Sequence, residues 1–345
     1  MKKIVKQVAG IDVAQKELVV SLGRMYDDLS TEIYACKTFS NQSKGFMALI
    51  AWINQLTEQQ LITSYVMEAT GVYHESLAYF LAEKGHIVSI VLPNKISNYF
   101  RTLEVKTITD KTSSEAIARF GLERKLDAWK RPGGIFKKLR QLTRERDQVV
   151  QHRSMIKNQL HAEQAEAEPN KSSVNRFKKQ IAFFNKQEQE IKAELESLIK
   201  QDKQVSESVK LIGSLSGIGM LTATTVLAET NGFELIRNKR QLVSYAGLDV
   251  REKQSGTSIK GKARISKKGN KYLRKAMHLP ALAAIRSDER FKAVFARLVA
   301  KHGIKMKAAV AVQRKLLEII YTVYKTNIPY DKNYFKKLES SIAAP

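Results

Sequence analysis

Acidic residues stand at the ends of strand-like runs in the first third of the chain, and they constrain the fold more than any other feature. Asp12 ends one apolar run and Glu68 ends another, while Asp110 stands where a helical pattern begins. A polar residue at the end of a buried strand faces solvent or a site and not a core. We therefore expect the three carboxylates to meet at one site.

Strand and helix patterns alternate around these acids. Three strand-like runs come first, and two more alternate with helical periodicity; the runs are Gln7 to Asp12, Glu17 to Leu22, Glu32 to Thr38, Ile62 to Glu68 and His86 to Val91, and the helical stretches are Lys44 to Leu56, Tyr73 to Lys84 and Asp110 to Leu122. This order predicts an α/β domain with an RNase H-like mixed sheet, covering residues 1–131. The Arg131-Pro132-Gly133-Gly134 break ends it.

Charge and length limit the class of protein. The 345 residues predict two or three domains, and 59 Lys and Arg against 34 Asp and Glu leave a formal charge of +25, which favours a polyanionic partner, foremost nucleic acid. No apolar stretch reaches the ~20 residues that span a bilayer, and the N-terminus leads directly into a strand. We expect a cytoplasmic protein without membrane contact. The single cysteine, Cys36, excludes an internal disulfide.

The middle of the chain, residues 135–205, predicts a helical hairpin. Apolar residues of the second arm follow a four-and-three spacing from Phe177 to Leu198, with Glu188 as the missing member. The first arm has a looser seam, broken by Arg146 and Arg153. Such arms either pair within one chain or dimerise, and the pattern leaves both open.

Residues 208–330 predict a mainly helical domain, followed by a tail over residues 331–345. A glycine-broken turn with Gly217 and Gly219 resembles a helix-hairpin-helix, where backbone N–H groups approach a DNA phosphate; a plain turn between packed helices is the alternative. The stretch Arg251 to Lys275 holds ten Lys or Arg residues and one acid. We expect phosphate contacts from this stretch. The residues expected at nucleic acid are Gly217, Gly219, Arg251, Lys253, Lys260, Lys262, Arg264, Lys267, Lys268, Lys271 and Arg274.

The carboxylates suit a metal site for phosphodiester chemistry. Two Mg²⁺ ions held roughly 4 Å apart by hard oxygen ligands activate the attacking oxygen and stabilise the leaving one. Asp12, Glu68 and Asp110 are the predicted ligands, with Mn²⁺ as a substitute metal. The alternative is that each acid has a local role, Asp110 as a helix cap and Glu68 in an ion pair.

The order of several short segments resembles the IS-one-ten family of insertion-sequence transposases, which includes Piv-type DNA invertases. The segments are Gly10-Ile11-Asp12-Val13-Ala14-Gln15-Lys16, Met67-Glu68-Ala69-Thr70-Gly71-Val72-Tyr73, Lys106-Thr107-Ile108-Thr109-Asp110-Lys111, Ser216-Gly217-Ile218-Gly219, Tyr245-Ala246-Gly247-Leu248, Gln254-Ser255-Gly256 and Ile265-Ser266-Lys267-Lys268-Gly269-Asn270-Lys271-Tyr272-Leu273-Arg274. The resemblance spans nearly the whole chain.

The resemblance implies a RuvC-like N-terminal domain with an Asp-Glu-Asp-Asp set, a coiled coil and a C-terminal transposase domain. It implies that Ser255 attacks DNA to form a phosphoserine link, whereas spacing alone would make Ser255 an ordinary loop serine. It further implies a bridge RNA that pairs with donor and target DNA, and a homodimer that assembles into a tetramer, with acidic site and serine from different protomers.

One position departs from the family pattern. The fourth acid should follow the third by three residues, where this chain has Ser113, and the next acid is Glu115. Residues 110 and 113 share a helix face, whereas residue 115 points away from it. Either three carboxylates and a water hold the metal, or Glu115 substitutes, or the acidic site is impaired.

These observations predict an RNA-guided DNA recombinase. The alternative is an RNase H-like, metal-dependent nuclease or junction resolvase that forms no covalent intermediate, and Ser255 separates the two. A basic coiled-coil scaffold without enzymatic activity would leave the ordered carboxylates unexplained.

Overall fold

The computed structural model divides the chain into two compact units, Met1–Arg131 and a second that begins at Pro132. It describes residues 2–69, 71–103, 105–234, 236–252, 254–256, 259–261 and 263–333, with backbone only at 259 and 260. Lys253, Lys262, the side chain of Lys260 and most of the tail predicted at 331–345 lie outside the described residues. In the ranges described, no helix is both long and apolar enough to cross a bilayer.

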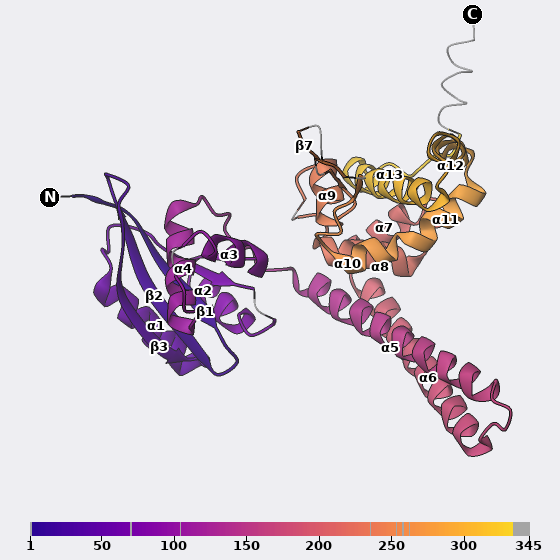
Figure 1. Cartoon of the computed structure of the whole chain (residues 1–345), viewed down its shortest axis with the longest axis horizontal. Coiled ribbons are helices and arrows are strands. Elements are labelled where there is room, and N and C mark those ends of the chain that lie inside the picture. Colours follow the sequence, from indigo (N-terminus) through magenta and orange to yellow (C-terminus); the bar gives the residue numbers. More distant parts are fainter. Residues whose placement is uncertain are drawn as a thin grey trace, which may run out of the picture. The chain divides into compact units, whose positions relative to one another are not determined.

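Unit 1 is built on a mixed five-stranded sheet. Its strands are β1 (Ile4–Val13), β2 (Glu17–Tyr26), β3 (Thr31–Ser40), β4 (Thr63–Glu68) and β5 (Ile87–Val91), in the order β3-β2-β1-β4-β5. The first three strands pair antiparallel, and β4 runs parallel to β1 and β5. The predicted strands are all confirmed, and the arrangement fits the expected RNase H-like domain (Figure 1).

Helices cover both faces of this sheet because β1 is apolar on both sides. Ala9, Ile11 and Val13 pack toward α1 (Ser43–Leu56) and α2 (Glu75–Glu83). Val8 packs on the opposite face toward α3 (Pro93–Phe100) and α4 (Asp110–Glu123). The sequence patterns predicted α1, α2 and α4 but not α3, which has only eight residues and begins on a proline at its first turn. Strand residues of even number in β1 therefore face α4.

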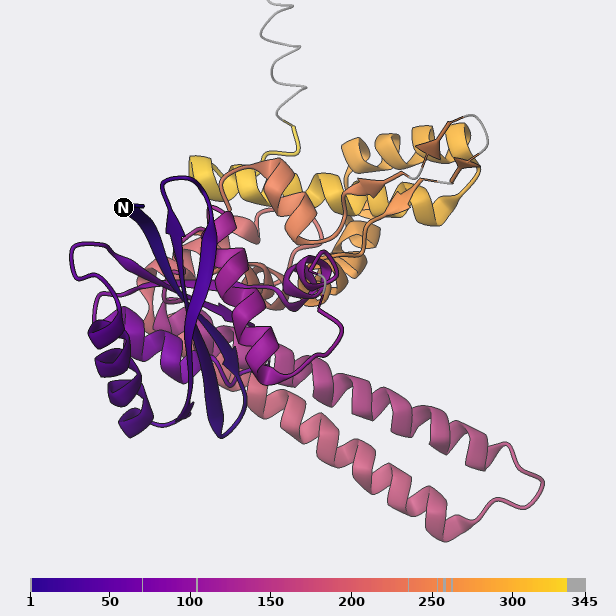
Figure 2. The same cartoon turned by 60° about the vertical axis from the view of Figure 1, so that its left-hand side comes forward.

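Unit 2 begins with two long helices that lie side by side, α5 (Gly134–Gln164) and α6 (Lys171–Gln201) (Figure 2). The remaining helices are α7 (Lys203–Ile212), α8 (Met220–Thr230), α9 (Lys239–Tyr245), α10 (Lys271–Ala276), α11 (His278–Ser287), α12 (Glu289–His302) and α13 (Lys305–Thr326). One core joins the root of the hairpin to these helices, with Leu139 of α5, Leu195 of α6 and Leu316 of α13 fully buried. The hairpin root is thus part of the fold of unit 2, and its far end extends away from that core (Figure 1).

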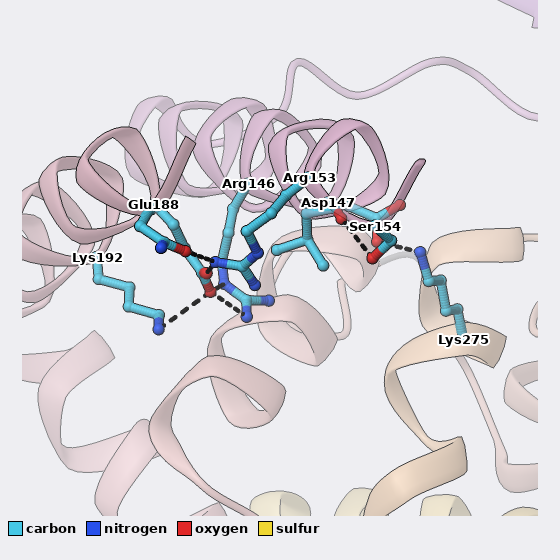
Figure 3. A network of polar contacts seen from close by, with 9 residues as sticks. Arg146, Asp147, Arg153, Ser154, Glu188, Lys192 and Lys275 are labelled. Carbon is cyan, nitrogen blue, oxygen red and sulfur yellow. Dashed lines mark hydrogen bonds and ion pairs between the residues drawn. The ribbon is translucent and has the colours of Figure 1, made fainter. Parts of the chain in front are cut away.

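Glu188 interrupts the apolar pattern of α6, and Arg146 and Arg153 interrupt that of α5. These polar residues contact one another inside the hairpin (Figure 3). Glu188 is 5% exposed and binds Arg146 at 2.7 Å, Lys192 at 3.0 Å and Arg153. Burial acts to raise the pKa of Glu188, but hydrogen bonds from Lys192, Arg146 and Arg153 outweigh it and hold the pKa at about 2. Because a buried charge without a partner is costly, this pairing selects one register of α5 against α6.

Candidate functional site

Sheet register brings Asp12 and Glu68 together. The parallel pairing of β1 and β4 ends at Ile11 opposite Met67, so the next residue on each strand is a carboxylate. Neighbouring residues at the same register of a sheet project from the same face. Asp12 and Glu68, both half-buried, therefore stand side by side on the face that α4 covers.

A glycine in β1 lets α4 approach that face closely. A Cβ atom on Gly10 would lie 2.2 Å from the Ala118 nitrogen and 2.5 Å from the Ser114 carbonyl oxygen. Farther along α4, a Cβ atom on Gly121 would lie 2.8 Å from a side-chain methyl of Val8. The helix therefore runs opposite to β1, and its first residue, Asp110, lies toward Asp12.

Hydrogen bonds hold α4 in this position. The Oγ atoms of Ser114 and Ser21 lie 2.7 Å apart in the core. At the other end, the ammonium group of Lys6 donates to the carbonyl oxygens of Gly121 at 2.6 Å and Leu122 at 2.8 Å. These last carbonyls of a helix have no partner inside the helix, so a lysine there both satisfies and orients them.

The structure rules out a capping role for Asp110. Thr109 is the N-cap of α4: its Oγ1 accepts a hydrogen bond from the Thr112 nitrogen at 3.2 Å, and its own nitrogen donates to Thr112 Oγ1 at 2.8 Å. The carboxylate of Asp110, in the first turn, therefore does not cap the helix and stays exposed at its N-terminus.

The electrostatics of Asp12 show that the three acids interact. Burial raises its pKa most, and the negative charges of Asp110 and Glu68 add to the effect, so the pKa reaches about 6. Even so, in the described part of the chain no three acidic, His or Cys side chains are gathered closely enough to form a ready metal cluster. The acids are neighbours that repel one another, not a closed set of ligands.

A hollow of about 320 Å³ opens beside Asp12 and Asp110, and its lining includes Glu17 and Tyr73. Sequence reasoning placed Tyr73 only at a helix start and in a family segment, and it missed Glu17 as a site residue. The one signal in the sequence was an aromatic residue five positions after Glu68, and the structure shows it exposed. Aromatic faces beside acidic sites suit nucleic-acid substrates, because bases and sugars stack on them.

The doubtful fourth position remains without a carboxylate. Ser113 is half-buried in the first turn of α4, and Glu115 forms an ion pair with Lys111 at 4.0 Å. Glu115 lies five residues after Asp110, which places it on another side of the helix. Neither residue lines the hollow beside Asp12.

Ser255 lies in unit 2 on a short β-ribbon. It belongs to β7 (Gln254–Ser255), pairs with Ile259 of β8 (Ile259–Lys260) and precedes Gly256, whose φ of +54° suits a glycine. The side chain is exposed, and none of the described residues forms a hydrogen bond with it. A second ribbon, β6 (Val250–Arg251) with β9 (Arg264–Ile265), lies in the same stretch, and neither ribbon was expected from the sequence.

Tertiary contacts join two of the family segments. Gly247 and Gly269 each pack closely against the backbone of the other segment. A Cβ on Gly269 would lie 2.4 Å from the Tyr245 carbonyl oxygen. Arg274 donates to the Ala246 oxygen at 2.8 Å, and Asn270 donates through its backbone to the Tyr245 oxygen at 2.6 Å. The basic segment is thereby fixed to helix α9.

The predicted nucleic-acid contacts fall into several groups. Gly217, with φ +83°, packs against α11, since a Cβ there would lie 2.7 Å from the Pro280 oxygen. That contact supports the alternative of a plain turn at this glycine, whereas Gly219 is open at the start of α8. Lys267, Lys271 and Arg274 line a cavity of unit 2. The exposed residues outside that cavity are Arg251, Arg264 and Lys268.

Comparisons with known proteins match both units. Residues 209–296 match the family described as "Transposase IS116/IS110/IS902 family", and residues 9–164 match a family described as "Transposase". The pilin gene-inverting protein of Moraxella bovis is 30% identical over 297 residues, covering 86% of this chain and 90% of that protein.

Two further matches are more limited. An uncharacterized 43.6 kDa protein of insertion element IS110 from Streptomyces coelicolor is 27% identical over 121 residues, covering 35% of this chain and 30% of that protein. The RuvC of T. thermophilus in complex with a Holliday junction substrate aligns at 11% identity and a TM-score of 0.26, covering 34% of this chain and 97% of that chain. Two family matches and a relative that is 30% identical over most of both chains agree with one another. The chain belongs to the IS116/IS110/IS902 family of transposases.

Proposed function

We propose that this transposase exchanges DNA strands through a covalent link to Ser255, with Asp12, Glu68 and Asp110 holding Mg²⁺ and a bridge RNA selecting the DNA. The observation that carries the acidic-site part of the proposal is geometric: Asp12 and Glu68 stand at the ends of neighbouring strands, and α4 brings Asp110 toward Asp12. Burial and the charges of Asp110 and Glu68 raise the pKa of Asp12. Perturbed acids in a hollow are typical of catalytic sites. The hollow beside Asp12 and Asp110 meets that description.

The donor set fits a divalent cation. Carboxylate oxygens are the hard ligands that Mg²⁺ prefers, and among the described residues no Lys or Arg forms an ion pair with Asp12 or Asp110. A cation would offset the repulsion from Asp110 and Glu68, which adds to burial in raising the Asp12 pKa. When bound, Mg²⁺ supplies positive charge to the oxygens of a scissile phosphate. The residues themselves must be ionised to bind it, so the raised Asp12 pKa makes binding dependent on pH.

The role proposed for Ser255 is the one that the family resemblance implies, and its exposed hydroxyl is compatible with that role. In the proposed step its Oγ forms a bond to phosphorus, the bond from phosphorus to the leaving strand oxygen breaks, and the hydroxyl proton passes to a base while the leaving oxygen gains a proton. Rejoining reverses these changes with a new strand end. An exposed serine beside a glycine turn is accessible to a DNA backbone.

Charge supports nucleic acid as the partner. The formal charge of +25 and the cations of the segment from Arg251 to Lys275 suit both DNA and a guide RNA. The proposed assembly is a homodimer that pairs into a tetramer on two duplexes, with the acids of one protomer and the serine of its partner at each site.

A second function has one observation in its favour. No described side chain is hydrogen-bonded to Ser255 and thus placed to remove its proton, whereas the three acids proposed as metal ligands all belong to unit 1. A nuclease that hydrolyses DNA with metal alone would need only that site.

The experiment that tests the proposal looks for a protein–DNA adduct on a denaturing gel. Element-junction DNA, RNA transcribed from the flanking noncoding region and Mg²⁺ are incubated with wild type, Ser255→Ala and Ser287→Ala. Ser287 is an exposed serine of the same unit and serves as the matched control. We expect an adduct with wild type and Ser287→Ala only, and none without RNA; cleavage without adduct in all three proteins would establish the nuclease instead.

A further inference from the structure

A cavity of about 710 Å³ lies at the root of the hairpin in unit 2. Its lining residues come from α5, α8, the end of β9 and the segment after it, α10, the start of α11 and α13. Pockets that hold small organic groups measure roughly 300–1,000 Å³. The space is therefore sufficient for one nucleotide but not for a duplex.

One wall of the cavity is a fixed aromatic and cationic surface. The guanidinium carbon of Arg144 lies 4.6 Å from the centre of the Tyr272 ring. Glu229, which is 1% exposed, holds Arg144 with two bonds of 2.7 and 2.8 Å and accepts a third hydrogen bond from Asn270 at 2.6 Å. Because Glu229 leaves Arg144 little freedom, the wall is already arranged before any ligand arrives.

Two of the cations that line the cavity have no ion-pair partner among the described residues. Arg144 is paired with Glu229, and Lys275 with Asp147. By contrast, Lys267 and Lys271 line the cavity and form no ion pair within the described ranges; Lys271 only approaches the Tyr272 ring, at 5.0 Å. Two ammonium groups on a rim beside an aromatic wall suit a phosphate attached to a base.

Helix α8 adds a third feature. Leu221 and Thr222 in its first turn line the cavity, and its N-cap, Gly219, offers no side chain to its free N–H groups. The positive end of α8 thus lies at the same cavity as Lys267 and Lys271. Apolar lining from Val150 and Leu279 completes a surface that accepts a base.

We propose that this cavity binds one unpaired nucleotide of a nucleic-acid strand, with its base against Tyr272 and Arg144 and its phosphate at Lys267 and Lys271. The proposal rests on the nucleic-acid-binding part of the proposed function and not on its covalent chemistry. DNA and RNA share the chemistry that the cavity recognises, so the experiment has one arm for each.

The test uses the full chain with short single-stranded DNA or RNA oligonucleotides that contain 5-iodouracil. Ultraviolet irradiation should cross-link the base to the Tyr272 peptide, identified by mass spectrometry, in the arm that supplies the ligand. Tyr272→Phe should keep the cross-link because the ring remains, whereas Tyr272→Leu should lose it and weaken binding about tenfold. Absence of a Tyr272 cross-link in both arms overturns the proposal.

Two neighbouring lysines distinguish binding in the cavity from general electrostatic attraction to the protein surface. Lys267 lines the cavity, and Lys268 beside it is exposed outside it. We expect Lys267→Gln to lower the slope of binding against salt by about one unit, and Lys268→Gln to change it by less than half of that. Equal losses for the two variants would mean that only the surface field attracts the strand.

The result can be told apart from the outcome for Ser255. If wild type forms the Ser255 adduct but neither arm cross-links to Tyr272, the cavity proposal fails and the proposed function stands. If Tyr272 cross-links while no adduct forms, the cavity binds nucleic acid and the serine mechanism fails.

Discussion

Replacing Asp12 with asparagine should stabilise the metal-free protein while it abolishes strand exchange. In the folded chain the pKa of Asp12 is about 6 against an ordinary value of 3.8, because of burial and the charges of Asp110 and Glu68. That difference corresponds to about 3 kcal/mol. Asp12 is only half-buried, so solvent screening reduces the expected gain to about 1–2 kcal/mol at pH 8.

The sign of the pH dependence follows from the raised pKa. Below pH 3.8 the carboxyl is protonated in both folded and unfolded chains, and it costs no stability. Between pH 3.8 and about 6 the unfolded chain ionises this carboxyl while the folded chain keeps its proton, so stability falls as the pH rises and the loss is complete above about 6. The advantage of Asp12→Asn should therefore be largest at pH 8 and fall to about half near pH 5.

Thermal unfolding of the full chain followed by circular dichroism measures this effect. With chelator present, the transition of unit 1 should rise by about 3–8 °C in Asp12→Asn at pH 8. Asp27→Asn, an exposed acid between β2 and β3, is the control and should leave it unchanged. Added Mg²⁺ should stabilise wild type and not Asp12→Asn. A lower transition temperature in the variant, or a gain independent of pH, would refute the repulsion among the acids.

Two further predictions concern packing and pairing. Gly10→Ala should destabilise unit 1 by about 3 kcal/mol, because the new Cβ would meet backbone atoms that cannot move aside. Gly121→Ala should cost less, about 1–2 kcal/mol, because its Cβ would meet side-chain methyls of two valines, the nearer at 2.8 Å, and no backbone atom. Urea unfolding should show that order, and the reverse order would contradict the close approach of α4. Glu188→Ala should lower the free energy of unfolding by about 2–3 kcal/mol, since it leaves two arginines of the hairpin without their carboxylate partner. The control, Glu190→Ala on the exposed face, should change it by no more than about 0.5 kcal/mol. Similar urea midpoints for the two variants would show that the charge cluster does not stabilise the hairpin.

Local patterns predicted the sheet of unit 1 well. Its five strands contain β-branched and apolar runs of strand length, so their type and their order along the chain follow from the sequence. The short elements were not predicted, because α3 has too few turns to show a helical periodicity and β6 to β9 have two residues each. A pattern needs several repeats before it stands out from its surroundings.

The contacts between the two helices of the hairpin could not be predicted from local sequence patterns. The sequence marks Glu188 as a break in one seam and Arg146 and Arg153 as breaks in the other, but no local rule says that these breaks meet. Which residues face each other depends on the register of α5 against α6, and that register is set by the combined packing of both helices.

The acidic site divides in the same way. The sequence by itself determined that Asp12 and Glu68 end strands, that Asp110 begins a helix and that the chain carries a large positive charge, because each is a property of neighbouring residues or of composition. Only the tertiary structure decided that Gly10 admits α4, that Thr109 relieves Asp110 of capping and that Tyr272, Arg144 and Glu229 form one wall. These contacts join residues far apart in the chain, and they form because close packing and the pairing of buried charges act through space and not along the sequence.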